Sequence, residues 1–246
     1  MKQRYKATLS YNGSNYHGWA KQPGQETIQG ILETKIHDIF KQSVKVYAAG
    51  RTDAGVNALG QIIHFDFEDI QITPKQIMEA LNKALPYDIR LTKIKKADKN
   101  FNARFDAKNK IYIYYINTNT TNNAVVSNHI YQYNKPLNIS LLKKTNKVFL
   151  GKHNFLSFST DERSGQSLER QIISINIKKS KDIVQIKIKG TGFLRSQVRM
   201  MVGAMLALNE NKITLSQIKN WLSNPKKGQA VYKAPACGLC LYKIKY

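Results

Sequence analysis

A strand–loop–strand pattern around one carboxylate constrains this chain more than any other feature. Residues 44–49 and 61–67 are rich in β-branched and aromatic side chains, which is typical of strands. The loop between them carries Asp53, with Gly50 before it and Gly55 after it. Glycine lets a ligand approach the backbone closely, and loops held by a rigid scaffold often carry chemistry. A polar turn with a capping Asp has the same composition, so spacing alone leaves both interpretations open.

Strand and helix patterns alternate along the rest of the chain. Apolar residues alternate over 5–11 and recur on one helical face over 27–41. Residues 73–76 predict a capping box with Pro at the first helical position, which opens a helix that stops before Pro86. In the second half we expect a strand over 110–117, a polar loop over 118–123, a helix over 140–150, a hairpin of 172–178 with 184–190, a helix over 195–208, a short helix capped by Thr214 and Gln217, and a last strand from about residue 238.

This order predicts an α+β fold of two similar halves that join near Arg104. We expect an N-terminal half over residues 1–104, which carries the loop of the acid, and a C-terminal half over residues 105–246. A chain of this length is compatible with one large domain or with two closely associated halves.

The charge of the chain favours a polyanionic partner. Lys and Arg number 39 against 16 Asp and Glu, giving a formal net charge of +23. Each phosphate that such a surface neutralises releases counterions and adds affinity. An AT-rich genome would exchange Arg for Lys but would not remove acids. The balance therefore indicates a nucleic-acid-binding protein.

Other features exclude several classes of protein. No stretch reaches the unbroken apolar length of a membrane helix, and residues 1–5 lead into a strand pattern and not into a signal peptide, so we expect a cytoplasmic protein. Cys237 and Cys240 precede a strand pattern, whereas a redox dithiol usually begins a helix. Zinc needs four ligands, and the five His residues are scattered. We expect packed cysteines and no metal.

The loop around Asp53 resembles the signature of the TruA family of tRNA pseudouridine synthases, in which Gly-Arg-Thr-Asp-x-Gly-Val-His-Ala precedes a strand. Asn57 stands where the family usually has His, and Asn12, Ala20 and Gln197 are further departures. The resemblance extends in order along nearly the whole chain, through blocks at 11–19, 81–89, 101–105, 110–114, 151–158, 193–203 and 234–241.

This resemblance implies the pseudouridine synthase fold, in which two similar α/β halves share an extended antiparallel sheet with helices packed on it and a central active-site cleft. It implies an isomerase that converts uridine to pseudouridine at positions 38, 39 and 40 in the anticodon stem-loop of tRNA. It also implies a homodimer that binds tRNA and needs no cofactor.

The resemblance assigns roles to five residues. Asp53 is the carboxylate that acts on the sugar or the base, and Arg51 fills the space of the flipped uridine or holds the neighbouring phosphate. Tyr112 stacks on the target base, Arg199 is the cation that keeps Asp53 ionised, and Leu239 forms the floor of the pocket. The residues alone leave other roles open: an ion pair with a loop carboxylate for Arg51, a core aromatic for Tyr112, a phosphate contact for Arg199 and ordinary packing for Leu239.

Two other functions stay open at this point. A retargeted paralogue would perform the same chemistry on ribosomal RNA. A non-catalytic RNA-binding or RNA-folding protein would use the same scaffold without the acid, but Asp53 is present here in its Arg-Thr context.

Overall fold

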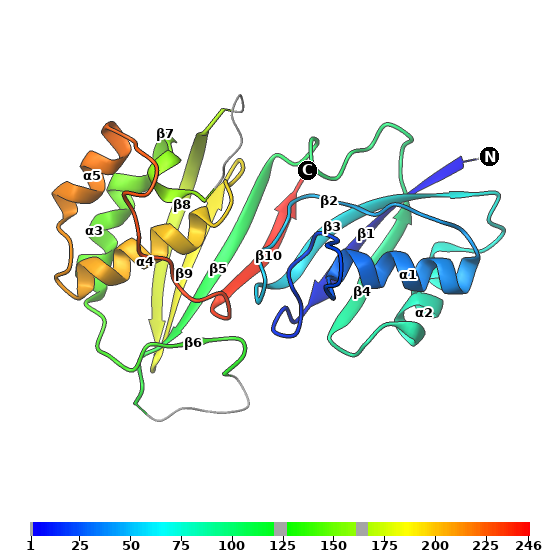
Figure 1. Cartoon of the computed structure of the whole chain (residues 1–246), viewed down its shortest axis with the longest axis horizontal. Helices are drawn as coiled ribbons and strands as arrows, with labels where there is room; N and C mark the ends of the chain where they lie inside the picture. The colour runs from blue at the N-terminus through cyan, green and yellow to red at the C-terminus, as the bar shows by residue number, and fades with distance from the viewer. Residues whose placement is uncertain (1, 121–126, 161–166) are drawn as a thin grey trace. The chain divides into compact units, whose positions relative to one another are not determined.

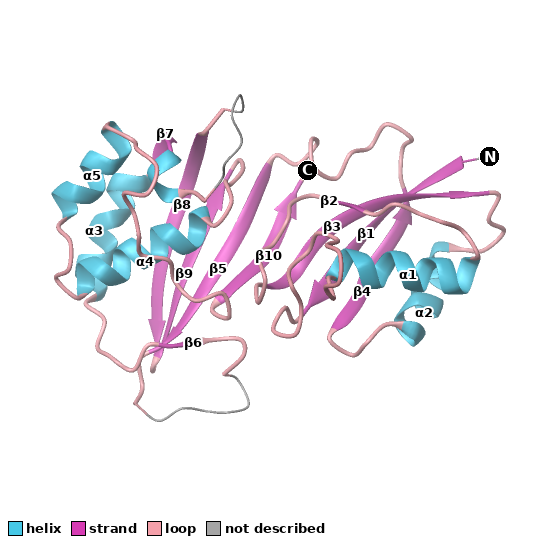
Figure 2. Ribbon diagram, viewed as in Figure 1, coloured by secondary structure: helices cyan, strands magenta, loops and turns pink. Residues whose placement is uncertain are grey.

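The computed structural model describes residues 2–120, 127–160 and 167–246 and divides into two compact units (Figure 1). The first unit comprises Met1–Lys108 and Leu241–Tyr246, and the second comprises Asn109–Cys240. Strand β10 (Leu239–Lys245) begins in the second unit and ends in the first. Each unit combines strands and helices, so the α+β class is confirmed (Figure 2). The division into halves at residue 104 stays a prediction.

The first unit contains a sheet with the strand order β4-β1-β3-β10. Its strands are β1 (Lys2–Tyr11), β3 (Asn57–Glu68) and β4 (Ile89–Lys96), and β1 is antiparallel to both neighbours. The short strand β2 (Tyr47–Ala48) also pairs with β3. The unit's helices are α1 (Ile28–Phe40) and α2 (Pro74–Ala84).

Alternation along β1 builds the core of this unit. Tyr5, Ala7 and Leu9 are buried, as the period of a strand requires. The Tyr5 ring lies 5.9 Å from the Phe65 ring and 5.8 Å from the Phe67 ring. Such aromatic pairs add stability beyond the area that they bury, so the middle of β1 is fixed firmly against β3.

The second unit has the antiparallel strand order β5-β9-β8-β7, with β6 parallel to β5. Its helix α4 (Gln197–Asn209) is buried along most of its length, which agrees with the nearly continuous apolar sequence of this helix. The elements of this unit are β5 (Asn109–Asn117), β6 (Tyr131–Gln132), α3 (Ile139–Phe149), β7 (Gly151–Asn154), the 3-10 helix η2 (Leu156–Phe158), β8 (Glu169–Ser180), β9 (Ile183–Gly190), α4 (Gln197–Asn209) and α5 (Leu215–Ser223).

The structure confirms the capping boxes and corrects some boundaries. Thr73 with Gln76 opens α2, and Thr214 with Gln217 opens α5, each by the reciprocal hydrogen bonds of a capping box. The strand expected over 44–49 is wrong for most of its length, because only the two residues of β2 pair there. Val44 and Val46 are nevertheless buried, so their apolar pattern reports burial and not strand pairing.

Three further expectations concern the start of α4, the polar loop over 118–123 and a membrane-spanning helix. The helix expected from residue 195 begins at Gln197, because Ser196 has a left-handed φ of 60°. Residues 121–123 of the expected polar loop lie outside the described part of the chain. Within the described residues, the structure contains no helix whose length and apolar character would allow it to span a membrane.

Candidate active site

The loop of Asp53 connects β2 to β3 in the first unit, as the sequence predicts. Ala49 donates its amide to the carbonyl of Ile62 at 2.8 Å, and the side-chain amide of Gln61 donates to the Gly50 carbonyl at 2.7 Å. The Val56 amide donates to the Asp53 carbonyl at 3.2 Å and closes a tight turn. Gly55 within this turn has a φ of 76°, a conformation that other residues rarely adopt.

Thr52, directly before the acid, is fixed from two sides by the turn that follows β1. Its hydroxyl lies 2.8 Å from the hydroxyl of Tyr11 in a buried hydrogen bond. Its carbonyl accepts the amide of Trp19 at 3.1 Å. A Cβ added at Gly18 would lie 2.8 Å from the same carbonyl, so only glycine lets the two segments approach this closely. The backbone beside Asp53 is therefore held by residues more than thirty positions away.

A second contact joins the same two segments on the other side of the acid. The side-chain oxygen of Asn57 accepts the amide of Gly13 at 2.9 Å, and Asn57 is only 6% exposed. A Cβ at Gly13 would lie 2.2 Å from the carbonyl oxygen of Val56, a distance that no side chain tolerates. The residue that replaces the usual His of the resembling family thus has a defined structural role here.

A third segment completes this framework. The amide of Asn12 donates to the carbonyl of Asp88 at 2.9 Å, and the hydroxyl of Tyr16 donates to the Asp88 carboxylate. Burial of Tyr16, together with this carboxylate, raises the pKa of its hydroxyl, so Tyr16 remains a donor at neutral pH. Three segments that are distant in sequence therefore form one hydrogen-bonded framework around the Asp53 loop.

Within this framework the acid and its neighbouring cation are more exposed than the residue between them. Thr52 is 8% exposed, whereas Asp53 is half-buried and Arg51 is exposed. Sequence reasoning singled out Asp53 and Arg51 but missed the framework residues Tyr11, Thr52, Asn57 and Gln61. The position of Tyr11, Thr52 and Asn57 inside the blocks that match the family was the available signal, whereas Gln61 lies outside these blocks. The arrangement presents one carboxylate and one guanidinium from a rigid backbone, which suits chemistry on an anionic substrate.

The three other predicted site residues lie in the second unit. Tyr112 on β5 is 8% exposed, and its ring packs edge-on against Phe193 at 5.2 Å. Arg199 on α4 donates its Nε to the Ala234 carbonyl at 2.8 Å, and the Ala234 amide donates back to the Arg199 carbonyl at 3.0 Å. Leu239 begins β10 and is buried.

The segment 234–239 links Arg199 with Leu239 inside this unit. Its start is bound by Arg199, and its end closes in a turn where the Leu239 amide donates to the Ala236 carbonyl at 2.9 Å. The hydroxyl of Tyr114 donates to the Pro235 carbonyl at 2.7 Å. A Cβ at Gly238 would lie 2.7 Å from the Tyr114 ring. The five predicted residues thus form two sets: Arg51 and Asp53 in the first unit, and Tyr112, Arg199 and Leu239 in the second.

Comparison with known proteins reaches residues of both sets, although the family model does not include Tyr112. The family model described as tRNA pseudouridine synthase matches residues 7–106 and 146–246, which include the Asp53 loop and α4. This chain belongs to the tRNA pseudouridine synthase family. It is 40% identical to tRNA pseudouridine synthase A of Mycoplasma genitalium, across 99% of this chain and 98% of that protein. The protein of the same name from Mycoplasmoides gallisepticum is 41% identical, across 97% of this chain and 89% of that protein. The protein of that name from a Thermotoga species is 36% identical, across 99% of this chain and 100% of that protein.

One departure of this family member has a clear structural reason. Gln197, which stands where a Met is usual, is 1% exposed at the start of α4. Its side-chain oxygen accepts the Leu194 amide at 2.8 Å. Gln197 thereby provides an acceptor for the amide of Leu194, a residue that is itself buried.

The cysteines of this tRNA pseudouridine synthase family member do not form a disulfide. Cys240 is buried and Cys237 is half-buried. Burial raises the pKa of the Cys237 thiol, the opposite of what a reactive thiolate requires. Among the described residues, no group of three or more His, Cys, Asp or Glu side chains is arranged to hold a metal ion.

Proposed function

We propose that this protein converts uridine to pseudouridine in tRNA, at positions 38, 39 and 40 of the anticodon arm, with Asp53 as the catalytic carboxylate. The observation that carries this proposal is the Asp53 loop, whose backbone is fixed by buried hydrogen bonds while its carboxylate stays half-buried. Membership of the tRNA pseudouridine synthase family and the names of the relatives support tRNA as the substrate.

The reaction is an isomerisation that this loop is suited to support. The N1–C1′ bond of the uridine breaks, the base turns, and a C5–C1′ bond forms. The C5 hydrogen leaves as a proton while N1 gains one, so no oxidant or group donor takes part. A carboxylate can act here as a nucleophile or as a base. A fixed backbone on both sides of Asp53 places that carboxylate without reorganisation during the reaction.

The other site residues bind and position the RNA. Arg51, exposed two residues before the acid, fills the space of the flipped uridine or holds the adjacent phosphate. Tyr112 stacks on the target base, and Leu239 forms the floor beneath it. Arg199, whose Nε is anchored on Ala234, contributes to binding of the substrate.

We further propose a cytoplasmic homodimer that binds the tRNA across both subunits. Three neighbouring target positions favour recognition by RNA shape and backbone charge over base reading, and the charge of +23 suits that mode. A two-fold dimer is also the commonest oligomer. Light scattering at micromolar concentration tests this part, and a monomer there would contradict it.

The decisive experiment measures tritium release from a tRNA transcript labelled at uridine C5, with purified protein and no added cofactor. We expect release by the native protein. The Asp53→Asn variant should lose on the order of 10²–10⁴-fold or more of the rate while retaining RNA affinity. The matched control is Asp38→Asn, an exposed acid on α1 that pairs only loosely with Lys35 at 3.8 Å.

The outcomes separate the competing functions. Activity that survives Asp53→Asn would reject Asp53 as the catalytic group. Release from ribosomal RNA fragments, with none from anticodon-arm substrates, would favour a retargeted paralogue. RNA binding without release from either substrate would favour a non-catalytic RNA-binding protein.

A further inference from the structure

Four lysines gather at the β1–β4 edge of the first unit. Lys6 on β1, Lys75 on α2, and Lys93 and Lys95 on β4 line an open hollow of about 540 Å³ together with two threonines, Met78 and Ile94. We call the four lysines the lysine patch. Thr8 and Thr92 line the same hollow, where the Thr92 hydroxyl donates to the Thr8 carbonyl at 3.4 Å. No residue that lines it is acidic.

The strand register brings like charges together in this patch. Lys6 lies directly opposite Lys95 in the antiparallel pair of β1 with β4, and Thr8 lies directly opposite Lys93. Residues opposite each other, or two apart on one strand, project from the same face of a sheet. Like charges directly opposite each other destabilise a sheet. The register therefore places Lys6 and Lys95 opposite each other at a cost to the stability of the sheet.

Lys6 is also held in place. Its Nζ lies 3.4 Å from the centre of the Tyr246 ring and 4.3 Å from that of Phe101. The Tyr246 hydroxyl donates to the carbonyl of Ala103 at 2.7 Å. Two aromatic rings thus fix the direction of the Lys6 ammonium.

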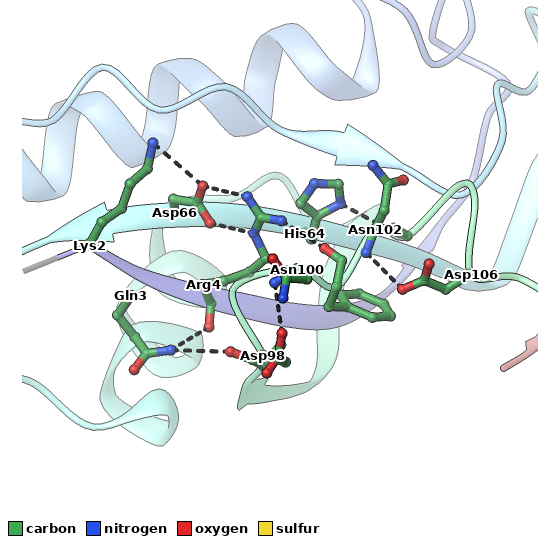
Figure 3. A network of polar contacts seen from close by, with 12 residues as sticks. Lys2, Gln3, Arg4, His64, Asp66, Asp98, Asn100, Asn102 and Asp106 are labelled. Atoms are coloured by element: carbon green, nitrogen blue, oxygen red, sulfur yellow. Dashed lines mark hydrogen bonds and ion pairs between the residues drawn. The ribbon is translucent and has the colours of Figure 1, made fainter.

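The segment 101–103, whose Phe101 ring contacts Lys6, is itself held to the sheet (Figure 3). Arg4 binds the carboxylate of Asp66 through two nitrogens, at 2.7 and 2.8 Å, and donates a third bond to the Phe101 carbonyl at 2.9 Å. The amide of Ala103 donates to Nδ1 of His64 at 3.1 Å. The aromatic platform is therefore rigid, and the ammonium that it carries is preorganised for a partner.

The charges around Lys6 are poorly balanced. Burial lowers the pKa of Lys6, and the neighbouring Lys95 lowers it further, while Asp106 acts in the opposite direction. Glu79 approaches Lys75 at 3.8 Å, and both of these side chains are exposed. An anion between Lys6 and Lys95 would relieve a repulsion that the protein on its own retains.

Edge strands commonly carry lysines that prevent sheets from pairing with one another, and β4 is the outer strand of this unit's sheet. That role explains Lys93 and Lys95. It does not explain Lys6, because β1 lies between β3 and β4 and has no exposed edge to protect. The pairing of an interior lysine with an edge lysine requires a second reason.

We infer that the lysine patch binds the phosphate backbone of the RNA substrate at a site separate from the Asp53 loop. This inference rests on the proposed function for the identity of the RNA. Lys6 and Tyr11 are five residues apart on β1, or roughly 17 Å along the strand, with their side chains on opposite faces of the sheet, and Tyr11 holds the Asp53 loop. That separation corresponds to a few base-pair steps, which is within the length of an RNA arm.

The test compares Lys93→Gln/Lys95→Gln with a control double variant, Lys143→Gln/Lys144→Gln. Both controls are exposed residues of α3, and both double variants remove two positive charges. Fluorescence anisotropy with a full-length tRNA transcript gives affinity over 50–200 mM salt, and tritium release gives kcat and KM. Thermal unfolding of each free protein gives Tm.

For the patch variant we expect the slope of log Kd plotted against log salt concentration to decrease by about 1.5–2. KM should rise on the order of tenfold while kcat stays unchanged, because the patch binds ground state and transition state alike. Tm should rise by about 1–3 °C, because the repulsion between Lys6 and residue 95 is gone. The control variant should change none of these quantities appreciably.

A patch variant with the same salt dependence and KM as the control would overturn the inference. A lower Tm than that of the native protein would also overturn it, because the lysines would then be structural. If the native protein releases no tritium, the proposed function fails, but the anisotropy comparison still decides whether the patch binds RNA.

Discussion

Removal of the Asn57 side chain tests whether the framework around Asp53 is what orders the loop. The Asn57 side-chain oxygen accepts the Gly13 amide at 2.9 Å in a buried position. Gly13 cannot move to find another acceptor, because its α-carbon already lies against the carbonyl of Val56. The Asn57→Ala variant therefore leaves a buried amide that has lost this acceptor.

The magnitude follows from the cost of that buried donor. An unsatisfied buried polar group costs about 1–3 kcal/mol. In a chain of this size, each kcal/mol lowers Tm by roughly 2–4 °C. We therefore expect Asn57→Ala to melt about 2–12 °C below the native protein. Tritium release should fall as well, because the turn that fixes Thr52 and Asp53 loses one of its attachments.

Substitution by His separates the hydrogen bond from the packing. The Nδ1 of His occupies the same position along the side chain as the Oδ1 of Asn, and a neutral His can accept a hydrogen bond there. Leu fills a similar volume but has no acceptor. We expect Asn57→His to melt above Asn57→Leu and to retain more activity, with circular dichroism and tritium release as the measurements. The reasoning is refuted if Leu performs as well as His, or if Asn57→Ala melts within about 1 °C of the native protein.

Two further predictions concern the second unit. Gly203→Ala should lower Tm by about 2–12 °C, because its Cβ would lie 2.3 Å from the Tyr232 carbonyl oxygen. Gly192→Ala is the control and should leave Tm unchanged, because the nearest contact of its Cβ is at 3.6 Å. An equal Tm for the two variants would contradict the role of close packing at Gly203. Glu210 accepts hydrogen bonds from Lys212, Lys135 and Tyr133, which lower its pKa to about 2. The stability that Glu210 contributes is therefore complete above its unfolded pKa of about 4.3 and is lost as the pH falls towards 2. The Tm difference between the native protein and Glu210→Gln should thus shrink over that window, and a difference independent of pH would argue against the ion pairs.

Local sequence signals predicted the parts of this fold that depend on local interactions. The capping boxes at Thr73 and Thr214 each involve a residue three positions later, so the sequence contains the whole interaction. The hairpin of β8 and β9 likewise joins neighbouring segments with a clear alternation of apolar residues. Motif resemblance predicted the family and drew attention to the loop of Asp53.

Interactions between distant segments could not be predicted in this way. Strand β4 was not expected, because lysines dominate its sequence and only Ile89 and Leu91 are buried. The hydrogen bond between Tyr11 and Thr52 spans 41 positions, and that between Gly13 and Asn57 spans 44. No periodicity reports such pairs. They become visible only once β1 lies beside β3 and brings the ends of both strands together.

The position of β1 gives the proposed site and the lysine patch a common physical basis. Lys6 lies in the middle of this strand, and Tyr11, which holds Thr52, lies at its end. Tyr5, packed against two Phe rings, keeps the strand from shifting between them. A phosphate contact on so rigid an element can set the register of the RNA relative to the Asp53 loop, but it cannot strengthen as the reaction proceeds. The patch should therefore govern how much RNA is bound at a given concentration, while the loop governs the rate once the RNA is bound.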